Sequence, residues 1–453
     1  MHYDICSCHV SLTDTQAVAE WNGVILGILS HGQSAPVHLG KLLELAPDYA
    51  LAHAVKGLSC LMLGRREMVD IAVQANTAAK AALAAGGATE RERLWCDALD
   101  AWINGRPSQS IACMETAMRL NPADTISMKL SHGIRFILGD SAGMRRSVES
   151  VLAAHGPDHA LRGYALGCLA FGMEETGSYA EAERIGLEGL TFANDDAWGL
   201  HAVTHVYDMT HRTDDGITLI DSNMAAWDHC NNFRFHVWWH KALLHLEQGD
   251  VAKVLDLYDT QVRNEKTDDF RDFSNASSLL VRLELEGHDV GPRWDELAEL
   301  AEARSTDGCL VFADLHYMLA LAGDNRNDAA ARMVARVARD AEATNEQARI
   351  MEDPGVAAAK GLAEFGAGKY ASAFAHLKAA QPRFQTMGGS HAQRDVFERV
   401  TIEAGLRAGQ LDATETLLQK RSALRSGAVD RFAQTRLKAI AEARGHQTSL
   451  AAE

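Results

Sequence analysis

The sequence feature that most constrains the fold is a glycine that recurs between helical stretches. The clearest case is Gly177-Ser178-Tyr179-Ala180-Glu181-Ala182, with the pattern G-x-Y-x-x-A, and Gly368-Lys369-Tyr370-Ala371-Ser372-Ala373 repeats it. A glycine ends a helix readily because it adopts the left-handed conformation without steric cost. We therefore expect pairs of helices joined by short turns. Looser versions of the pattern follow Gly64, Gly105, Gly139, Gly249, Gly323 and Gly409.

The spacing of these glycines predicts a repeat architecture. Most neighbours lie about 34 to 45 residues apart, and the larger interval from Gly177 to Gly249 predicts a repeat without its glycine, near Arg212. Such a period is typical of helix-turn-helix repeats, in which each hairpin buries its apolar stripe against the next. We predict an all-α fold of tetratricopeptide-like repeats forming an α-solenoid. Its irregular units would allow it to close around a central pocket.

The domain organisation is predicted from the linkers that the chain lacks. No stretch rich in Pro, Gly or Ser separates domains, so we expect one continuous array over residues 1–445 and a polar C-terminal tail over 446–453. The start lacks the basic segment and long apolar run of a secretory signal, and the apolar run at 21–29 is too short to span a bilayer. We expect a cytoplasmic protein with no membrane partner.

The charge balance excludes one class of partner. Lys and Arg number 44 against 61 Asp and Glu, a net charge of −17. An acidic surface repels phosphates, so we expect no nucleic-acid partner. The eight cysteines lack the paired spacing of metal sites and are expected to be reduced, with metal binding by Cys6-Ser7-Cys8-His9 as the alternative. Assembly into a homo-oligomer stays open.

Histidine and tryptophan gather in one predicted helix. Trp198, His201, His205 and Asp208 stand at i, i+3, i+7 and i+10, which is one stripe of an α-helix. One repeat period after the Gly177 hairpin, this segment is the first helix of the next repeat. First helices line the concave groove in this architecture, so we expect the stripe to face a ligand.

The following repeat carries a second histidine pair. His236 and His240 are four residues apart and share a helix face beside Trp239. Two such pairs on neighbouring helices could hold a divalent transition metal, could form a polar pocket of neutral imidazoles, or could be buried histidines that fix the packing. These three interpretations stay open, and no other cofactor is indicated. The candidate metal ligands are His201, His205, His236 and His240.

Three further polar residues occupy helical surroundings. Asp272 lies in an acidic run before the predicted helix 274–286, where the helix dipole alone favours carboxylates. Asp314 and His316 lie inside an apolar helical run at 312–322. A buried carboxylate requires a partner, and a cationic His or Arg is the expected one.

A glycine pair precedes the last candidate segment. In Gly388-Gly389-Ser390-His391-Ala392-Gln393-Arg394, the Ser and the Gln three residues later predict a capping box at a helix start. Free backbone N–H groups beside His391 and Arg394 would suit a ligand carboxylate. A plain helix cap is the alternative interpretation.

On these residues the chain resembles a bacterial member of the tetratricopeptide repeat protein 38 family. The resemblance covers nearly the whole chain and implies a repeat protein without a settled activity. Asn275 and Ala313 depart from the family, which has Asp and Asn there. The resemblance groups His201, His205, His236, His240, Asp272, Asp314, His316 and Arg394 as one candidate site. The matching segments are 196–205, 236–243, 257–260, 290–294, 312–316 and 388–397.

Three functions follow as hypotheses. The leading one is an inner pocket for a small polar, carboxylate-bearing molecule or a short peptide, with Trp198 and Trp239 as apolar walls and Arg394 on the carboxylate. The alternative is an enzyme, a hydrolase or lyase of a small metabolite, with or without a divalent metal. The third, a protein-interaction scaffold, is an analogy of fold. The ligand-binding candidates include Asp208, Ser390 and His391, and the catalytic candidates are His201, His205, Asp208, Asp314 and His316.

Overall fold

The computed structural model describes residues 2–451 of the chain, with side chains described for residues 2–445. Contacts divide these residues into two compact units. Among the described residues, unit 1 comprises 2–206, 220–237 and 344–349, and unit 2 comprises 207–219, 238–343 and 350–451. The predicted single array over 1–445 stays a prediction. The predicted tail at 446–453 begins inside a helix that continues to Ala451, and residues 452–453 lie outside the described residues.

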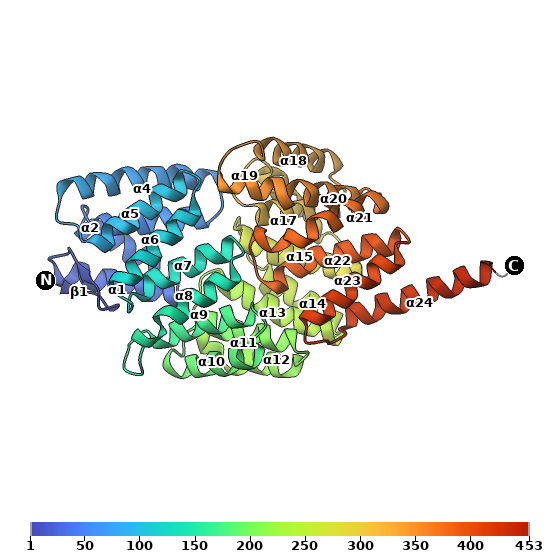
Figure 1. The fold of residues 1–453 in the computed structure, drawn as a ribbon, viewed down its shortest axis with the longest axis horizontal. Coiled ribbons are helices and arrows are strands. Elements are labelled where there is room, and N and C mark those ends of the chain that lie inside the picture. The colour runs from blue at the N-terminus through green and yellow to red at the C-terminus, as the bar shows by residue number, and fades with distance from the viewer. Residues whose placement is uncertain (1, 452–453) are drawn as a thin grey trace. The chain divides into compact units, whose positions relative to one another are not determined.

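Unit 1 consists of antiparallel helix pairs that follow a two-stranded hairpin (Figure 1). Its strands are β1 (His2–Tyr3) and β2 (His9–Val10), with His2 opposite Val10. Its helices are α1 (Thr15–Leu29), α2 (Ala35–Leu45), α3 (Ala50–Met62), α4 (Arg66–Ala85), α5 (Glu90–Ile103), α6 (Pro107–Leu120), α7 (Thr125–Ile137), α8 (Ser141–Val151), η1 (Leu152–Ala154), α9 (Arg162–Glu174), α10 (Tyr179–Phe192) and η2 (Met224–Ala226).

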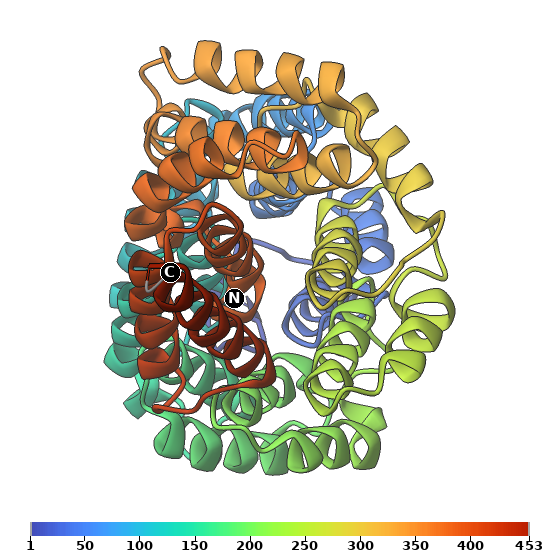
Figure 2. The same cartoon turned by 90° about the vertical axis from the view of Figure 1, so that its right-hand side faces the viewer.

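Four helices have residues in both units: α11 (Ala197–Met209), α12 (Thr213–Ser222), α13 (Phe233–Gln248) and α19 (Glu346–Ile350). Unit 2 contains the remaining helices, whose pairing is seen from a second side in Figure 2. They are α14 (Val251–Leu257), η3 (Tyr258–Val262), α15 (Phe270–Leu285), α16 (Arg293–Arg304), α17 (Val311–Gly323), α18 (Asn327–Asp340), η4 (Met351–Gly355), α20 (Val356–Gly366), α21 (Tyr370–Ala380), η5 (Gln381–Met387), α22 (His391–Arg407), α23 (Leu411–Leu424) and α24 (Arg431–Ala451).

The helix pairs turn at residues with positive φ. Most predicted glycines occupy this position, among them Gly177 with φ 81° between α9 and α10 and Gly368 with φ 72° between α20 and α21. The predicted repeat without a glycine turns at His211, with φ 59°, one residue before Arg212. The all-α fold of tetratricopeptide-like helical hairpins is therefore confirmed. No helix among the described residues is long and apolar enough to cross a membrane.

One predicted turn glycine has a different role. Gly323 is the last residue of α17, and the left-handed residue of this turn is Asn325, with φ 55°. A Cβ atom at Gly323 would lie 2.5 Å from the Trp294 ring. Gly323 is thus required by close packing between α16 and α17 rather than by its backbone conformation.

A salt-bridged polar core fixes the start of unit 1. The Arg91 guanidinium lies 2.6 Å from Asp4 and 2.8 Å from Asp124, with both carboxylates fully buried. Asp4 also accepts hydrogen bonds from the Trp21 indole and from the amides of Cys6 and Cys8. A buried charge is tolerated only when it is paired and hydrogen-bonded. The N-terminal hairpin is consequently tied to α1, α5 and the start of α7.

Candidate metal centre

The predicted histidine stripe lies on α11 in unit 1. Trp198, His201 and His205 are buried, with exposed fractions of 8%, 2% and 1%. Helix α9, two helices before α11, is buried from Gly163 to Glu174, and its Phe171 ring lies 4.5 Å from the Trp198 ring. Helix α11 thus packs beside an almost wholly apolar helix that ends in a carboxylate. The first turn of α13 adds Phe233 and His236. Three helices therefore supply the polar side chains of one small region.

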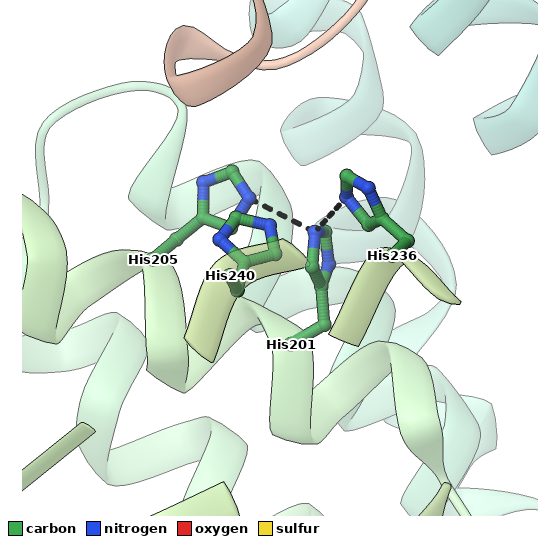
Figure 3. Close-up of side chains that lie close together, drawn as sticks. All are labelled: His201, His205, His236 and His240. Atoms are coloured by element: carbon green, nitrogen blue, oxygen red, sulfur yellow. Dashed lines mark hydrogen bonds between the residues drawn. The ribbon is translucent and has the colours of Figure 1, made fainter. Parts of the chain in front are cut away.

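The Nε2 atoms of three histidines meet at one point (Figure 3). His201 Nε2 lies 2.9 Å from His205 Nε2 and 3.1 Å from His236 Nε2. His240 follows His236 by one turn of α13, and one nitrogen of each of the four imidazoles lies within 4.8 Å of the others. The sequence-predicted histidines are thus brought together.

Hydrogen bonding among neutral imidazoles does not account for this meeting point. An imidazole nitrogen carries either one N–H or one in-plane lone pair, so it makes one good hydrogen bond. His201 Nε2 faces two other ring nitrogens at hydrogen-bonding distance. An ion that accepts a lone pair from each ring would satisfy all of them at once. Nitrogen ligands on one tetrahedral zinc lie about 3.3 Å apart, because Zn–N bonds are about 2.0–2.1 Å.

A buried carboxylate stands behind one of these rings. Glu174 Oε2 lies 3.5 Å from His205 Nδ1, and both side chains are 0% exposed. Within the described part of the chain, no hydrogen bond reaches either carboxylate oxygen of Glu174. Metal-bound histidines commonly direct their second N–H at a carboxylate, which fixes the tautomer. Glu174 is positioned for that role, with the Nε2 lone pair of His205 left for the metal.

Aromatic rings surround the histidines. The His201 ring centroid lies 5.4 Å from Phe171, 5.1 Å from Trp198 and 5.3 Å from Phe233. The Trp198 indole donates a 3.2 Å hydrogen bond to His132 Nε2, and burial lowers the pKa of His132 well below its ordinary value. These surroundings are largely aromatic and of low polarity, which strengthens any interaction with a cation at the imidazoles.

The other predicted residues near this stripe have different partners. Asp208 accepts a 2.9 Å hydrogen bond from Arg425, which belongs to a charged network of unit 2. Trp239 is fully buried, with its ring 4.8 Å from that of His240 and 5.5 Å from the Arg282 guanidinium carbon. Trp239 thus serves the interior of unit 2.

Asp272, Asp314 and His316 are buried in unit 2. Asp272 accepts a 2.5 Å hydrogen bond from the Thr267 hydroxyl, and Asp314 lies 2.6 Å from Arg336, an Arg partner of the kind that was expected. Burial raises the pKa of Asp314 to about 6 although Arg336 opposes the shift. His316 Nδ1 donates to the Phe312 carbonyl at 2.7 Å, and burial lowers its pKa to about 3. His316 is therefore a neutral imidazole at any ordinary pH.

The predicted helix start at Ser390 is confirmed. Ser390 and Gln393 form a capping box at the beginning of α22. Arg394 donates to the Gly389 carbonyl, and its guanidinium lies 3.4 Å from His391 Nδ1. The next residue, Asp395, accepts 2.6 Å hydrogen bonds from both Arg399 and Arg421. The segment therefore contributes directly to the ion pairs of unit 2, while carboxylate binding by Arg394 stays a prediction.

Those ion pairs line a small cleft of about 20 Å³ in unit 2. Burial alone would raise the pKa of Asp395, but Arg421 and Arg399 outweigh it and hold the pKa well below its usual range. The lining contains four acidic and four basic side chains, so their formal charges are matched in number. Its lining residues are Asp208, Leu243, Leu246, Glu247, Arg282, Glu286, Ala392, Asp395, Arg399, Arg425, Arg431 and Phe432.

Two functional candidates were missed in the sequence, Glu174 and Lys129. Glu174 is the only charged residue in the run 163–174, three residues before the turn glycine Gly177. That isolation was a usable signal. No sequence signal pointed to Lys129, because its neighbour Trp198 lies 69 residues away in the sequence.

No family model matches the sequence. Among solved structures, the chain is similar to the crystal structure of yeast Tom70, with 12% identity and a TM-score of 0.38 over 96% of this chain and 88% of that one. It is also similar to a structure of Naa15/Naa10 bound to HypK-THB, with 11% identity and a TM-score of 0.25 over 90% of this chain and 64% of that one. At such values these similarities carry no argument about function, and the site itself must supply it.

Proposed function

We propose that this helical-repeat protein is a divalent-metal-dependent hydrolase of small polar molecules, with the metal held by His201, His205 and His236. The observation that carries the proposal is the pair of short contacts at His201 Nε2, 2.9 Å to His205 Nε2 and 3.1 Å to His236 Nε2. Glu174, 3.5 Å behind His205, supports it as the carboxylate that orients a metal-bound histidine.

The reaction class follows from the ligand type. Three neutral imidazoles leave the full charge on a divalent ion, and such sites keep one position for water, whose pKa the ion lowers towards neutrality. Hydrolysis then consumes one water: its hydroxyl adds to the acyl carbon, the C–N or C–O bond breaks, and the proton goes to the leaving group. His240, one turn beyond His236, would close that position if it also bound the metal. We propose that it does not.

The assignment to the tetratricopeptide repeat protein 38 family is also a proposal. The three ligands lie in two of the segments that carry the resemblance, 196–205 and 236–243. A cytoplasmic location and a small-molecule partner belong to the same proposal.

The first experiment measures metal in the purified full chain by elemental mass spectrometry. We expect one equivalent of a divalent transition metal in the wild type and less than a tenth of that in His201→Ala and His236→Ala. His376→Ala changes a half-exposed histidine of α21 and should keep the metal. Circular dichroism confirms that each variant is folded. A folded wild type that holds no metal after incubation with Zn²⁺, Co²⁺ or Mn²⁺ contradicts the proposal.

The second experiment separates a catalytic centre from a structural one. The Co²⁺-loaded protein is examined by visible absorption with and without His240→Ala, followed by hydrolysis of 4-nitrophenyl acetate. An unchanged spectrum and metal-dependent hydrolysis in both proteins support an open position. A spectrum that changes on loss of His240, without hydrolysis in the wild type, would leave a closed structural site and no hydrolase.

A further inference from the structure

The ammonium group of Lys129 lies beside the aromatic surroundings of the histidines. Lys129 Nζ of α7 is 4.7 Å from the centroid of the Trp198 ring and 4.0 Å from Cys168 Sγ. The same Trp198 ring lies 5.1 Å from the ring of His201. Because both distances share Trp198, Lys129 Nζ is roughly 10 Å or less from the His201 ring.

This ammonium is not matched by a close carboxylate. Among residues 2–445, whose side chains the structure describes, no carboxylate oxygen lies within 4 Å of Lys129 Nζ. The Asp196 carboxylate caps α11 by accepting from the amides of Trp198 and Gly199, and Lys129 acts on it electrostatically by lowering its pKa. Burial raises the pKa of Asp196 to about 7, so it offsets the lysine only in part near neutral pH. Burying a charge is costly unless it is paired, so an anion beside Lys129 would stabilise the partly buried ammonium.

The side chains around Lys129 are partly exposed to solvent. Lys129, His31, Phe233 and His236 are half-buried, so they form a rim that solvent reaches, whereas Trp198 and His201 behind them are buried. The His31 ring stacks on Phe233 at 4.5 Å and lies 5.7 Å from Trp198. An apolar group of a ligand could pack against these rings while its anionic group reaches the lysine.

We propose that Lys129 binds the anionic group of the substrate, and that the substrate class is small carboxylate-bearing amides or esters with an apolar or aromatic part. This inference deepens the proposed function and rests on it for the hydrolytic step. A carboxylate on Lys129 places an acyl carbon a few bonds away within reach of the histidine cluster. The lysine is a specificity-determining residue because it touches the substrate at a distance from the reacting bond.

The test uses three probes and calorimetry on the full chain. Benzoate, phenyl phosphate and benzyl alcohol share a ring and differ in charge. Lys129→Met keeps the apolar stem against Trp198 and removes the charge, and Lys129→Arg keeps the charge. Lys56→Met changes an exposed lysine of α3 and is the matched control. We expect the benzoate Kd to rise at least tenfold in Lys129→Met, to stay within threefold in Lys129→Arg and Lys56→Met, and the benzyl alcohol Kd to be unchanged throughout.

The outcomes separate the inference from the metal proposal. Metal content is measured on the same samples, and Lys129→Met should retain it. Unchanged benzoate binding in a folded, metal-loaded Lys129→Met would overturn the role of Lys129 and leave the metal centre standing. Lysine-dependent benzoate binding to a wild type without metal would support the anion site and contradict the hydrolase. Binding of phenyl phosphate but not benzoate would overturn the carboxylate class in favour of phosphate.

Discussion

Asp395 and Arg421 form a two-point ion pair in the interior of unit 2, with Oδ1 2.6 Å from Nε and Oδ2 3.2 Å from Nη2. Asp395→Asn leaves the buried guanidiniums of Arg421 and Arg399 short of one negative charge. Removing one partner of a buried pair costs about 3–5 kcal/mol. We expect the free energy of unfolding in urea to fall by that amount.

Asp412→Asn, at an exposed carboxylate beside Arg444, is the control and should change stability by less than about 1 kcal/mol. Equal effects of both variants would contradict this account.

The pH dependence of stability should change when Glu247 is neutralised. Burial and then the nearby Asp430 raise the pKa of Glu247 from 4.5 to about 7. The folded protein therefore binds the Glu247 proton more tightly than the unfolded chain does. The contribution of protonated Glu247 to stability is complete below pH 4.5 and is lost as the pH rises through 7. Glu247→Gln still accepts from the Arg431 amide and avoids this loss.

We expect Glu247→Gln to be more stable than the wild type by about 3 kcal/mol at pH 8 and equally stable at pH 4. Thermal unfolding at both pH values measures the difference. If the difference in stability between the variant and the wild type is the same at pH 4 and pH 8, it arises from packing and not from ionisation of Glu247.

Glu174→Gln tests the carboxylate behind His205. Loss of such an outer carboxylate lowers metal affinity by about 10- to 100-fold, because the ring loses its oriented tautomer and some basicity. Competition with a chromophoric chelator measures the affinity. Glu181→Gln, at an exposed position of α10, is the control and should bind metal as the wild type does. If Glu174→Gln keeps full affinity, Glu174 has no role in the metal site.

Gly323→Ala tests close packing between α16 and α17. The added methyl group would meet the Trp294 ring at 2.5 Å, and such overpacking costs about 1–3 kcal/mol. Gly40→Ala, inside α2 with no atom within 4 Å of the new Cβ, should instead stabilise by up to about 1 kcal/mol. In chemical unfolding, we expect Gly323→Ala to lower the free energy of unfolding and Gly40→Ala to raise it. If Gly323→Ala leaves the free energy of unfolding unchanged, Trp294 can move aside.

Helical periodicity explains what could be predicted from the sequence. Which side chains share a helix face depends only on spacing, so the stripe of Trp198, His201 and His205 was predictable, and so was the pairing of His236 with His240. The hairpin turns followed from the conformational preference of glycine, including the turn without a glycine at His211.

Partners distant in the sequence could not be predicted in this way. Asp208 continues the stripe of Trp198, yet its partner Arg425 comes 217 residues later. The same applies to Lys129, which contacts Trp198 through packing of α7 beside α11. The spacing rule that predicts one helix face contains no information about which other helix lies against it.

The short segment 344–349 belongs to unit 1 although 106 residues of unit 2 precede it directly, from 238 to 343. Glu346 accepts hydrogen bonds from the hydroxyl and amide of Ser108 and donates its own amide to the Gly105 carbonyl. During synthesis, the ribosome must therefore translate more than three quarters of the protein before the α5–α6 turn receives its last partner. Neither unit can be separated from the other by a single cut in the gene.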